Sequence, residues 1–201
     1  MTDSTEKKYS KLAKVITLVT TPAVVGGVLL FYAVYMFSPT TEIFYKTFLS
    51  VLFLSVVLPV AFIFLLMKKG KIGNFHMKER EDRILPFGFT LMSGTFSILV
   101  VRYLNNDPVL VRMFLVFFLM ALGYSVITFL KFKISGHTFV FTSAMIILII
   151  FLDLRFIFLL PLVFLIGWAR VYLEEHTLGE VVGGAAYAIT SFILFSLLIN
   201  N

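Results

Sequence analysis

The sequence predicts an all-α fold, a polytopic bundle of about six or seven membrane-spanning helices. Of its 201 residues, 60% are hydrophobic and only 14% are charged, and the mean hydropathy is +1.00. A soluble domain is about 45–50% apolar and about 25% charged, so the composition places the chain in the membrane class. The sequence has no cysteine, which excludes disulfides, thiolate catalysis and cysteine-ligated metals.

Uncharged runs of residues give the predicted helices. A membrane span needs about 17–25 residues, and six of the seven runs in this chain meet that length by themselves. Backbone groups in lipid must be hydrogen-bonded internally, so runs of this length are expected to be helical. The runs are Val15–Thr41, Thr47–Met67, Ile84–Val101, Met113–Leu130, Ile134–Leu152, Phe156–Ala169 and Val181–Asn201.

Two features bear on the ends and the shape of these helices. The sixth run, Phe156–Ala169, spans a membrane only when Arg170 and the following VYL extend it. Pro22, Pro59 and Pro161 lie inside predicted spans and are expected to kink them. We therefore expect seven helices whose ends differ by several residues from the ends of the runs.

Seven spans place alternate connections on the same side of the membrane. The connections 68–83, 131–137 and 174–180 all fall on the side of the N-terminus, and together they hold all three histidines, His76, His137 and His176. No internal repeat or low-complexity segment divides the chain. We expect one integral-membrane domain over residues 1–201, with one polar face that carries the chemistry.

The segment KISGHTF contains a candidate anion site at a predicted helix start. A helix start offers unpaired backbone N–H groups and the positive end of the helix dipole. Gly136 allows close approach of the backbone to a ligand, Ser135 adds a hydroxyl donor, and His137 titrates near neutral pH. The alternative is an ordinary helix cap, with Ser135 as the N-cap and His137 in contact with solvent.

The segment WARVYLEEHTLGE carries a second cluster of polar residues. An arginine at the end of a membrane span is costly, and its planar fork suits bidentate binding of phosphate. His176 and Glu180 are four residues apart, so in a helix they lie one turn apart on one face. A carboxylate bonded to one imidazole nitrogen leaves the other as a nucleophile or base. The alternative is a snorkelling Arg170 followed by a solvated acidic loop, and we assign Glu174 and Glu175 to such a loop.

The basic segment FHMKEREDRILPF precedes the third predicted helix. It supplies Lys78, Arg80 and Arg83. Taken alone, a basic loop of this kind is typical of the cytoplasmic side of a membrane protein.

Together the three segments resemble the type-2 phosphatidic acid phosphatase superfamily of membrane lipid phosphatases, which have vanadium-haloperoxidase-like catalytic motifs. The family pattern is K-x6-R-P, then P-S-G-H, then S-R-x5-H-x3-D. The second element corresponds to Ser135-Gly136-His137, and the third to Arg170, His176 and Glu180, with both spacings matched. Ile134, Ala169 and Glu180 replace the family's proline, serine and aspartate.

The first element diverges from the family pattern. Six residues after Lys78 the sequence reads Leu85-Pro86, so the family's arginine is missing there. Arg83 is the expected substitute and Arg80 the second choice. The resemblance covers about residues 70–185.

The resemblance implies a phosphohydrolase that uses no metal and no cofactor. By analogy with the family, His176 attacks phosphorus, Glu180 orients it, and His137 protonates the leaving alkoxide. The implied phosphate-binding residues are Lys78, Arg83, Ser135, Gly136 and Arg170.

The family implies a lipid-phosphate substrate and the lipid bilayer as partners, with no role for nucleic acid. Its usual substrates are phosphatidate, phosphatidylglycerophosphate and polyprenyl (di)phosphates, and the expected location is a bacterial inner membrane. Family members usually present the site to the periplasm, lumen or exterior, whereas Lys7, Lys8, Lys11 and Lys14 favour a cytoplasmic N-terminus and motif face. The alternatives are an inactive relative that binds lipid phosphate and, less favoured, a small transporter.

Overall fold

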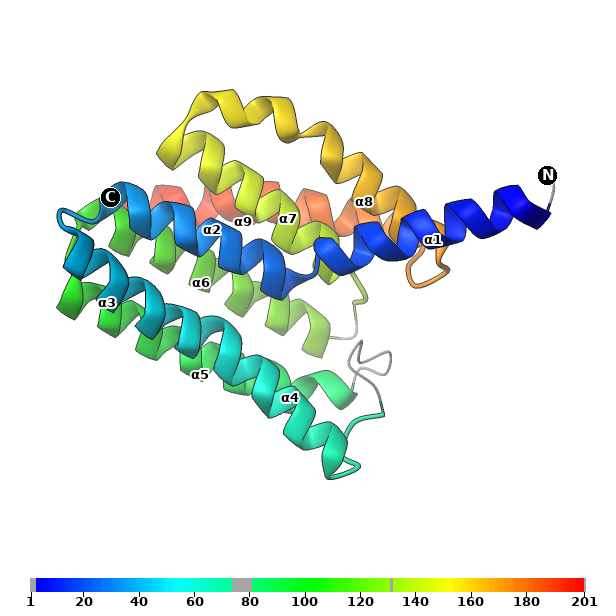
Figure 1. Ribbon diagram of the computed structural model, residues 1–201, viewed down its shortest axis with the longest axis horizontal. Helices are drawn as coiled ribbons and strands as arrows, with labels where there is room; N and C mark the ends of the chain where they lie inside the picture. Colours follow the sequence, from blue (N-terminus) through cyan, green and yellow to red (C-terminus); the bar gives the residue numbers. More distant parts are fainter. Residues whose placement is uncertain (1–2, 74–80, 131, 201) are drawn as a thin grey trace. The chain divides into compact units, whose positions relative to one another are not determined.

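A computed structural model describes residues 3–73, 81–130 and 132–200, which are all-helical apart from short connections and contain no strand (Figure 1). This confirms the predicted fold class. The chain divides into two compact units, which we describe separately. The first unit comprises Met1–Leu29 and Lys133–Leu194, and the second comprises Leu30–Phe132 and Phe195–Asn201.

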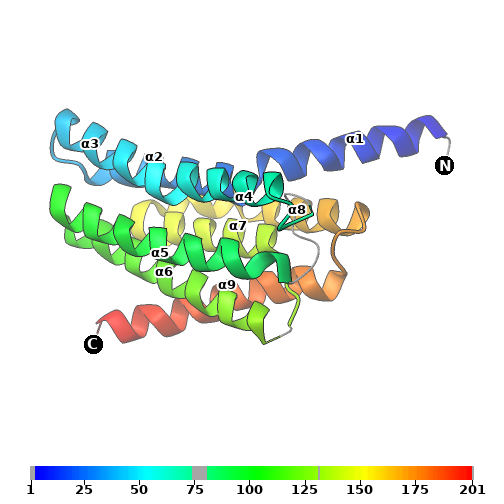
Figure 2. The ribbon, with the colours of Figure 1, turned by 90° about the horizontal axis from the view of Figure 1, so that it is seen from below.

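Long apolar helices make up the second unit. Figure 2 shows α5 and α6 side by side, and α5 also packs against α3 and α4. Asp107 caps the start of α6 by accepting hydrogen bonds from the backbone N–H groups of Val109 and Leu110, both at 2.9 Å. The elements are the second part of α2 (Pro22–Phe37), α3 (Thr41–Leu52), the π-helical turn η1 (Phe53–Val57), α4 (Leu58–Lys68), α5 (Glu81–Leu104) and α6 (Pro108–Phe129).

Serine hydroxyls join α5 to the helix formed by α3, η1 and α4. The Ser55 and Ser97 hydroxyls lie 2.8 Å apart, and the Ser93 hydroxyl donates to the carbonyl of Leu54. A π-helical turn displaces carbonyls from the regular ladder, and η1 begins one residue before Leu54. Polar groups in an apolar setting require partners from neighbouring helices, and these serines provide them.

The first unit contains the segments that carry the second and third sequence elements. Its α7 runs beside α8 and α9 (Figure 1). The elements are α1 (Asp3–Val19), the first part of α2, α7 (Gly136–Ile147), the π-helical turn η2 (Leu148–Leu152), the 3₁₀ helix η3 (Leu154–Leu159), α8 (Pro161–Tyr172) and α9 (Leu178–Asn200) as far as Leu194, the rest of α9 belonging to the second unit.

Glycines bring the helices of the first unit close together. A Cβ on Gly184 of α9 would lie 2.6 Å from the backbone carbonyl oxygen of Ser135, at the start of α7. A Cβ on Gly167 of α8 would lie 2.7 Å from a side-chain methyl of Val181. Real Cβ atoms do not approach this closely, so hydrogen side chains at both positions are required for the observed packing.

Each predicted apolar run corresponds to helix, but not always to one straight span. Among the described residues, five helices are long and apolar enough to cross a membrane, or six if a bent pair counts as one span. That pair comes from the predicted run Val15–Thr41, which breaks before Pro22 with a bend of 46°. The helical segment Gly136–Leu152 is shorter than a full span. Pro59 and Pro161 lie inside the continuous helical segments Thr41–Lys68 and Leu154–Tyr172, just after η1 and η3, where the hydrogen-bond pattern changes to that of α4 and α8.

Candidate active site

The start of α7 is a capped helix terminus. Ser135 is the N-cap, and its Oγ accepts hydrogen bonds from the Thr138 N–H at 3.4 Å and the Thr138 hydroxyl at 3.0 Å. Because Thr138 donates in both bonds, the Ser135 hydroxyl proton is left to donate elsewhere. The N–H of Gly136 lies outside the hydrogen-bond ladder of the helix. Ser135 and His137 are both buried.

The end of α8 is a tight C-terminal turn. The Glu175 N–H donates to the Arg170 carbonyl at 3.1 Å, and the Glu174 N–H donates to the Val171 carbonyl at 2.9 Å. These two bonds define a Schellman motif, whose C′ residue takes a left-handed conformation and is usually glycine. Here that residue is Glu174, with φ of 54°. The motif reverses the chain immediately before His176.

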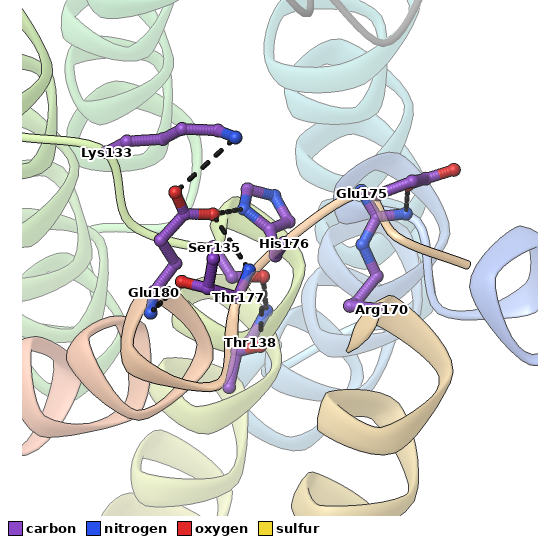
Figure 3. A network of polar contacts seen from close by, with 8 residues as sticks. All are labelled: Lys133, Ser135, Thr138, Arg170, Glu175, His176, Thr177 and Glu180. Carbon is purple, nitrogen blue, oxygen red and sulfur yellow. Dashed lines mark hydrogen bonds and ion pairs between the residues drawn. The ribbon is translucent and has the colours of Figure 1, made fainter. Parts of the chain in front are cut away.

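The start of α9 is a capping box that also holds the histidine. The Glu180 N–H donates to the Thr177 hydroxyl at 3.2 Å, and the Thr177 N–H donates to Glu180 Oε2 at the same distance. The same Oε2 lies 2.7 Å from His176 Nδ1 (Figure 3). An ionised carboxylate only accepts hydrogen bonds, so Nδ1 carries the proton and Nε2 keeps its lone pair. The His176 side chain is 7% exposed.

The starts of α7 and α9 meet at Glu180. The Ser135 N–H donates to the Glu180 backbone carbonyl at 2.9 Å, and Lys133 Nζ lies 3.4 Å from Glu180 Oε1. Figure 3 shows Lys133, Ser135 and His176 around this glutamate. Residues 133–138 and 170–180 therefore form one polar cluster within the first unit.

Burial sets the protonation state of His176. Its pKa lies below the ordinary value, chiefly because burial disfavours the charged ring, while the hydrogen bond to Glu180 acts in the opposite direction. The positive charges of Arg170 and Lys133 lower the pKa further. At neutral pH the ring is therefore neutral, as a nucleophile or base requires.

Arg170 forms an ion pair with Glu175 (Figure 3). The arginine side chain is 5% exposed and the glutamate side chain 23%. The Schellman motif accounts for the pairing, because it brings the C″ side chain over the third residue from the helix end. The interpretation of Glu175 as part of a solvated acidic loop is wrong, whereas Glu174 is exposed.

The arrangement combines an oriented neutral imidazole, a buried guanidinium and a helix N-terminus. Residues 128–201 match the PAP2 superfamily. The resemblance inferred from the sequence is thereby confirmed over this segment, which holds the second and third elements. The match supports a phosphatase-like membrane protein. The comparisons with curated proteins and with solved structures gave no match.

The first sequence element precedes the residues that match the PAP2 superfamily. Lys78 and Arg80 are outside the described residues. Arg83 lies in the first turn of α5, in the second unit. Its assignment to the phosphate site stays a prediction.

Three residues of this polar cluster were not identified as site residues from the sequence. Thr177 had a visible signal, since T-x-x-E is the capping-box signature. Glu175 had none, because the glycine that usually marks a Schellman motif is replaced by Glu174. Lys133 belongs to a basic loop, where sequence alone does not distinguish one lysine from another.

No group of three His, Asp or Glu side chains is placed to hold a metal ion in residues 3–73, 81–130 and 132–200. The carboxylate of Glu175 contacts Arg170, and that of Glu180 contacts Lys133 and His176.

Proposed function

We propose that this protein is an integral-membrane phosphohydrolase that releases phosphate from a lipid phosphate through a phosphohistidine, without a metal. The observation that carries the proposal is His176, which follows the buried Arg170 by six residues, has a side chain only 7% exposed, and has its Nδ1 2.7 Å from Glu180 Oε2. The PAP2 match over residues 128–201 supports the same chemistry.

The proposed reaction has two displacements at phosphorus. His176 Nε2 attacks the phosphorus atom, the bond from phosphorus to the lipid oxygen breaks, and His137 gives its proton to the leaving alkoxide. Glu180 stabilises the positive charge that develops on the His176 ring. Water then attacks the phosphorus, with His137 as the base, and the P–N bond breaks to release inorganic phosphate.

Positioning and charge stabilisation carry most of the rate in phosphoryl transfer. In the proposal, Arg170, the Ser135 hydroxyl and the Gly136 N–H bind the phosphoryl oxygens, together with the α7 dipole. We also propose Lys78 and Arg83, the residues of the first element, as phosphate-binding residues.

The proposed substrate has a phosphate head group and a lipid tail. Arg170 ends a membrane-length apolar helix, and α9 begins another at Leu178, so a phosphate bound between them lies at the level of the bilayer surface. Phosphatidate, phosphatidylglycerophosphate and polyprenyl diphosphate all fit this description. We place the protein in a bacterial inner membrane.

The test is phosphate release by purified protein in detergent with EDTA, across these three lipids and a soluble phosphomonoester. His176→Ala is expected to lower kcat/KM by at least about 10³-fold. His76→Ala changes a histidine outside the motifs and serves as the control. Unchanged release by His176→Ala would contradict the mechanism.

A second candidate is a lipid-phosphate-binding protein without catalytic activity. The absence of the family's arginine before Pro86 favours it. Tight binding of a lipid phosphate without turnover of any substrate in the panel would support this function over the enzyme.

A further inference from the structure

Arg170 is occupied by a carboxylate of its own chain. Its guanidinium is almost fully buried and forms an ion pair with Glu175 through Nη1. Its Nε has no hydrogen-bond partner among the described residues. A buried guanidinium is costly without a counter-charge, so an anion is needed at this position when no substrate is bound.

The two glutamates of the cluster are held very differently. Glu180 contacts His176, Thr177 and Lys133 and is fixed by the capping box. The one ion pair or hydrogen bond of the Glu175 side chain within the described residues is to Arg170. Glu175 also lies in the connection between α8 and α9 and keeps 23% of its side chain exposed. Its carboxylate can therefore turn into solvent, whereas the buried Arg170 has no such alternative.

We propose that Glu175 is an internal anion that occupies Arg170 in the free protein and is displaced by the phosphate of the substrate. This inference rests on the proposed function, in which Arg170 binds a phosphoryl oxygen. A phosphate must replace one charge-assisted contact with stronger ones, and a dianion makes stronger contacts than a monoanion. Because the same fraction of the free protein has an unoccupied Arg170 whichever anion binds, Glu175 weakens the apparent binding of monoanions and dianions by the same factor.

The experiment compares binding of orthophosphate and of dimethyl phosphate, a phosphodiester monoanion, by calorimetry. The proteins are wild type, Glu175→Gln and Glu174→Gln, the last being a matched loss of charge at the exposed neighbour. In Glu175→Gln, orthophosphate and dimethyl phosphate are each expected to bind about 10-fold tighter, because no carboxylate competes for Arg170. Glu174→Gln is expected to bind both anions like wild type.

Unchanged binding of both anions by Glu175→Gln would overturn the inference. Weaker binding of orthophosphate by Glu175→Gln would also overturn it, since Glu175 would then position Arg170 for phosphate. Thermal unfolding in detergent checks that each variant is folded, and Glu175→Asp, which keeps the charge, is expected to retain the wild-type affinities. Turnover is measured separately, so a changed anion affinity and a lost enzymatic activity are distinguishable.

Discussion

Two arginine–carboxylate pairs lie at the two ends of the membrane-length segment Leu154–Tyr172. At its start, Arg155 contacts Asp153 through Nε and Nη2 at 2.5–3.0 Å, with 87% of the arginine side chain exposed. At its end, Arg170 pairs with Glu175 through Nη1 and is 5% exposed. The first pair has the fuller contact geometry, yet water solvates both partners and screens their attraction. The buried pair has fewer contacts, but little water can replace them when they are lost. Because of this burial, loss of Arg170 is expected to affect stability and activity more than loss of Arg155.

The two pairs also differ in how far hydrogen bonds connect them to other helices. The Asp153 carboxylate lies at the start of its own helical turn, where it accepts from the Arg155 N–H at 2.8 Å. At the other end, the turn that holds Arg170 leads directly into the capping box of α9, and α9 is joined to the start of α7. A change at the exposed pair is therefore expected to stay local, and a change at the buried pair to spread.

Replacing each arginine by glutamine is expected to give the largest difference between the two pairs. Arg170→Gln is expected to lower kcat/KM for lipid phosphate by about 10²–10³-fold, the typical effect of removing one transition-state donor. It also leaves Glu175 without its partner, which is expected to lower the free energy of unfolding by about 1–3 kcal/mol. Arg155→Gln is expected to leave turnover and thermal unfolding unchanged. Comparable losses in the two variants would contradict the role of burial.

The link between α9 and α7 can be tested without touching a charge. Gly184→Ala places a Cβ 2.6 Å from the Ser135 carbonyl oxygen, so α9 must move away from α7. We expect kcat/KM to fall by about 10-fold or more, because small displacements of catalytic groups are costly, with unfolding free energy lowered by about 1–3 kcal/mol. Gly26→Ala, with nothing within 4 Å of the new Cβ, is the control. Wild-type activity of Gly184→Ala would show that this contact does not position the site.

The pH dependence of activity tests the protonation state of His176 at the buried end, with a smaller expected effect. Because burial lowers the pKa of His176 from about 6.5, the ring stays neutral as pH falls through that value, and kcat/KM should decline only at lower pH. Glu180→Gln removes a contact that raises this pKa, so the residual activity of that variant should decline at still lower pH. The measurement is kcat/KM between about pH 4 and 8 for both proteins. An acid limb centred above pH 6.5 in wild type would contradict the assignment of His176 as the neutral nucleophile.

Hydrophobic runs were enough to predict the helices, because the bilayer demands long apolar segments. Hydrophobic runs were less informative about where a helix breaks and whether it contacts lipid or protein, because local geometry determines both. The run from Val15 breaks before Pro22, and the run from Ile134 gives the helix α7, nine of whose twelve residues are buried. An apolar sequence does not distinguish a helix that contacts lipid from one that contacts protein.

The spacing of His176 and Glu180 predicted that these two residues pair, although His176 precedes α9 and the capping box, not one helix face, brings them together. It did not predict the partner of Arg170. That pairing depends on the left-handed backbone at Glu174, a conformation that a glutamate in the sequence does not suggest. Arg83 could not be placed by spacing either, because its element departs from the family pattern.

One carboxylate oxygen of Glu180 serves both the N-terminus of α9 and the ring of His176. Fraying of the first turn of α9 therefore releases the imidazole as well, and the local opening free energy of that turn sets an upper limit on the fraction of time for which the nucleophile is aligned. Amide hydrogen exchange at Thr177 and Glu180 would report on this opening. In this protein, the same hydrogen bonds determine where a helix begins and whether its neighbouring histidine is held ready to react.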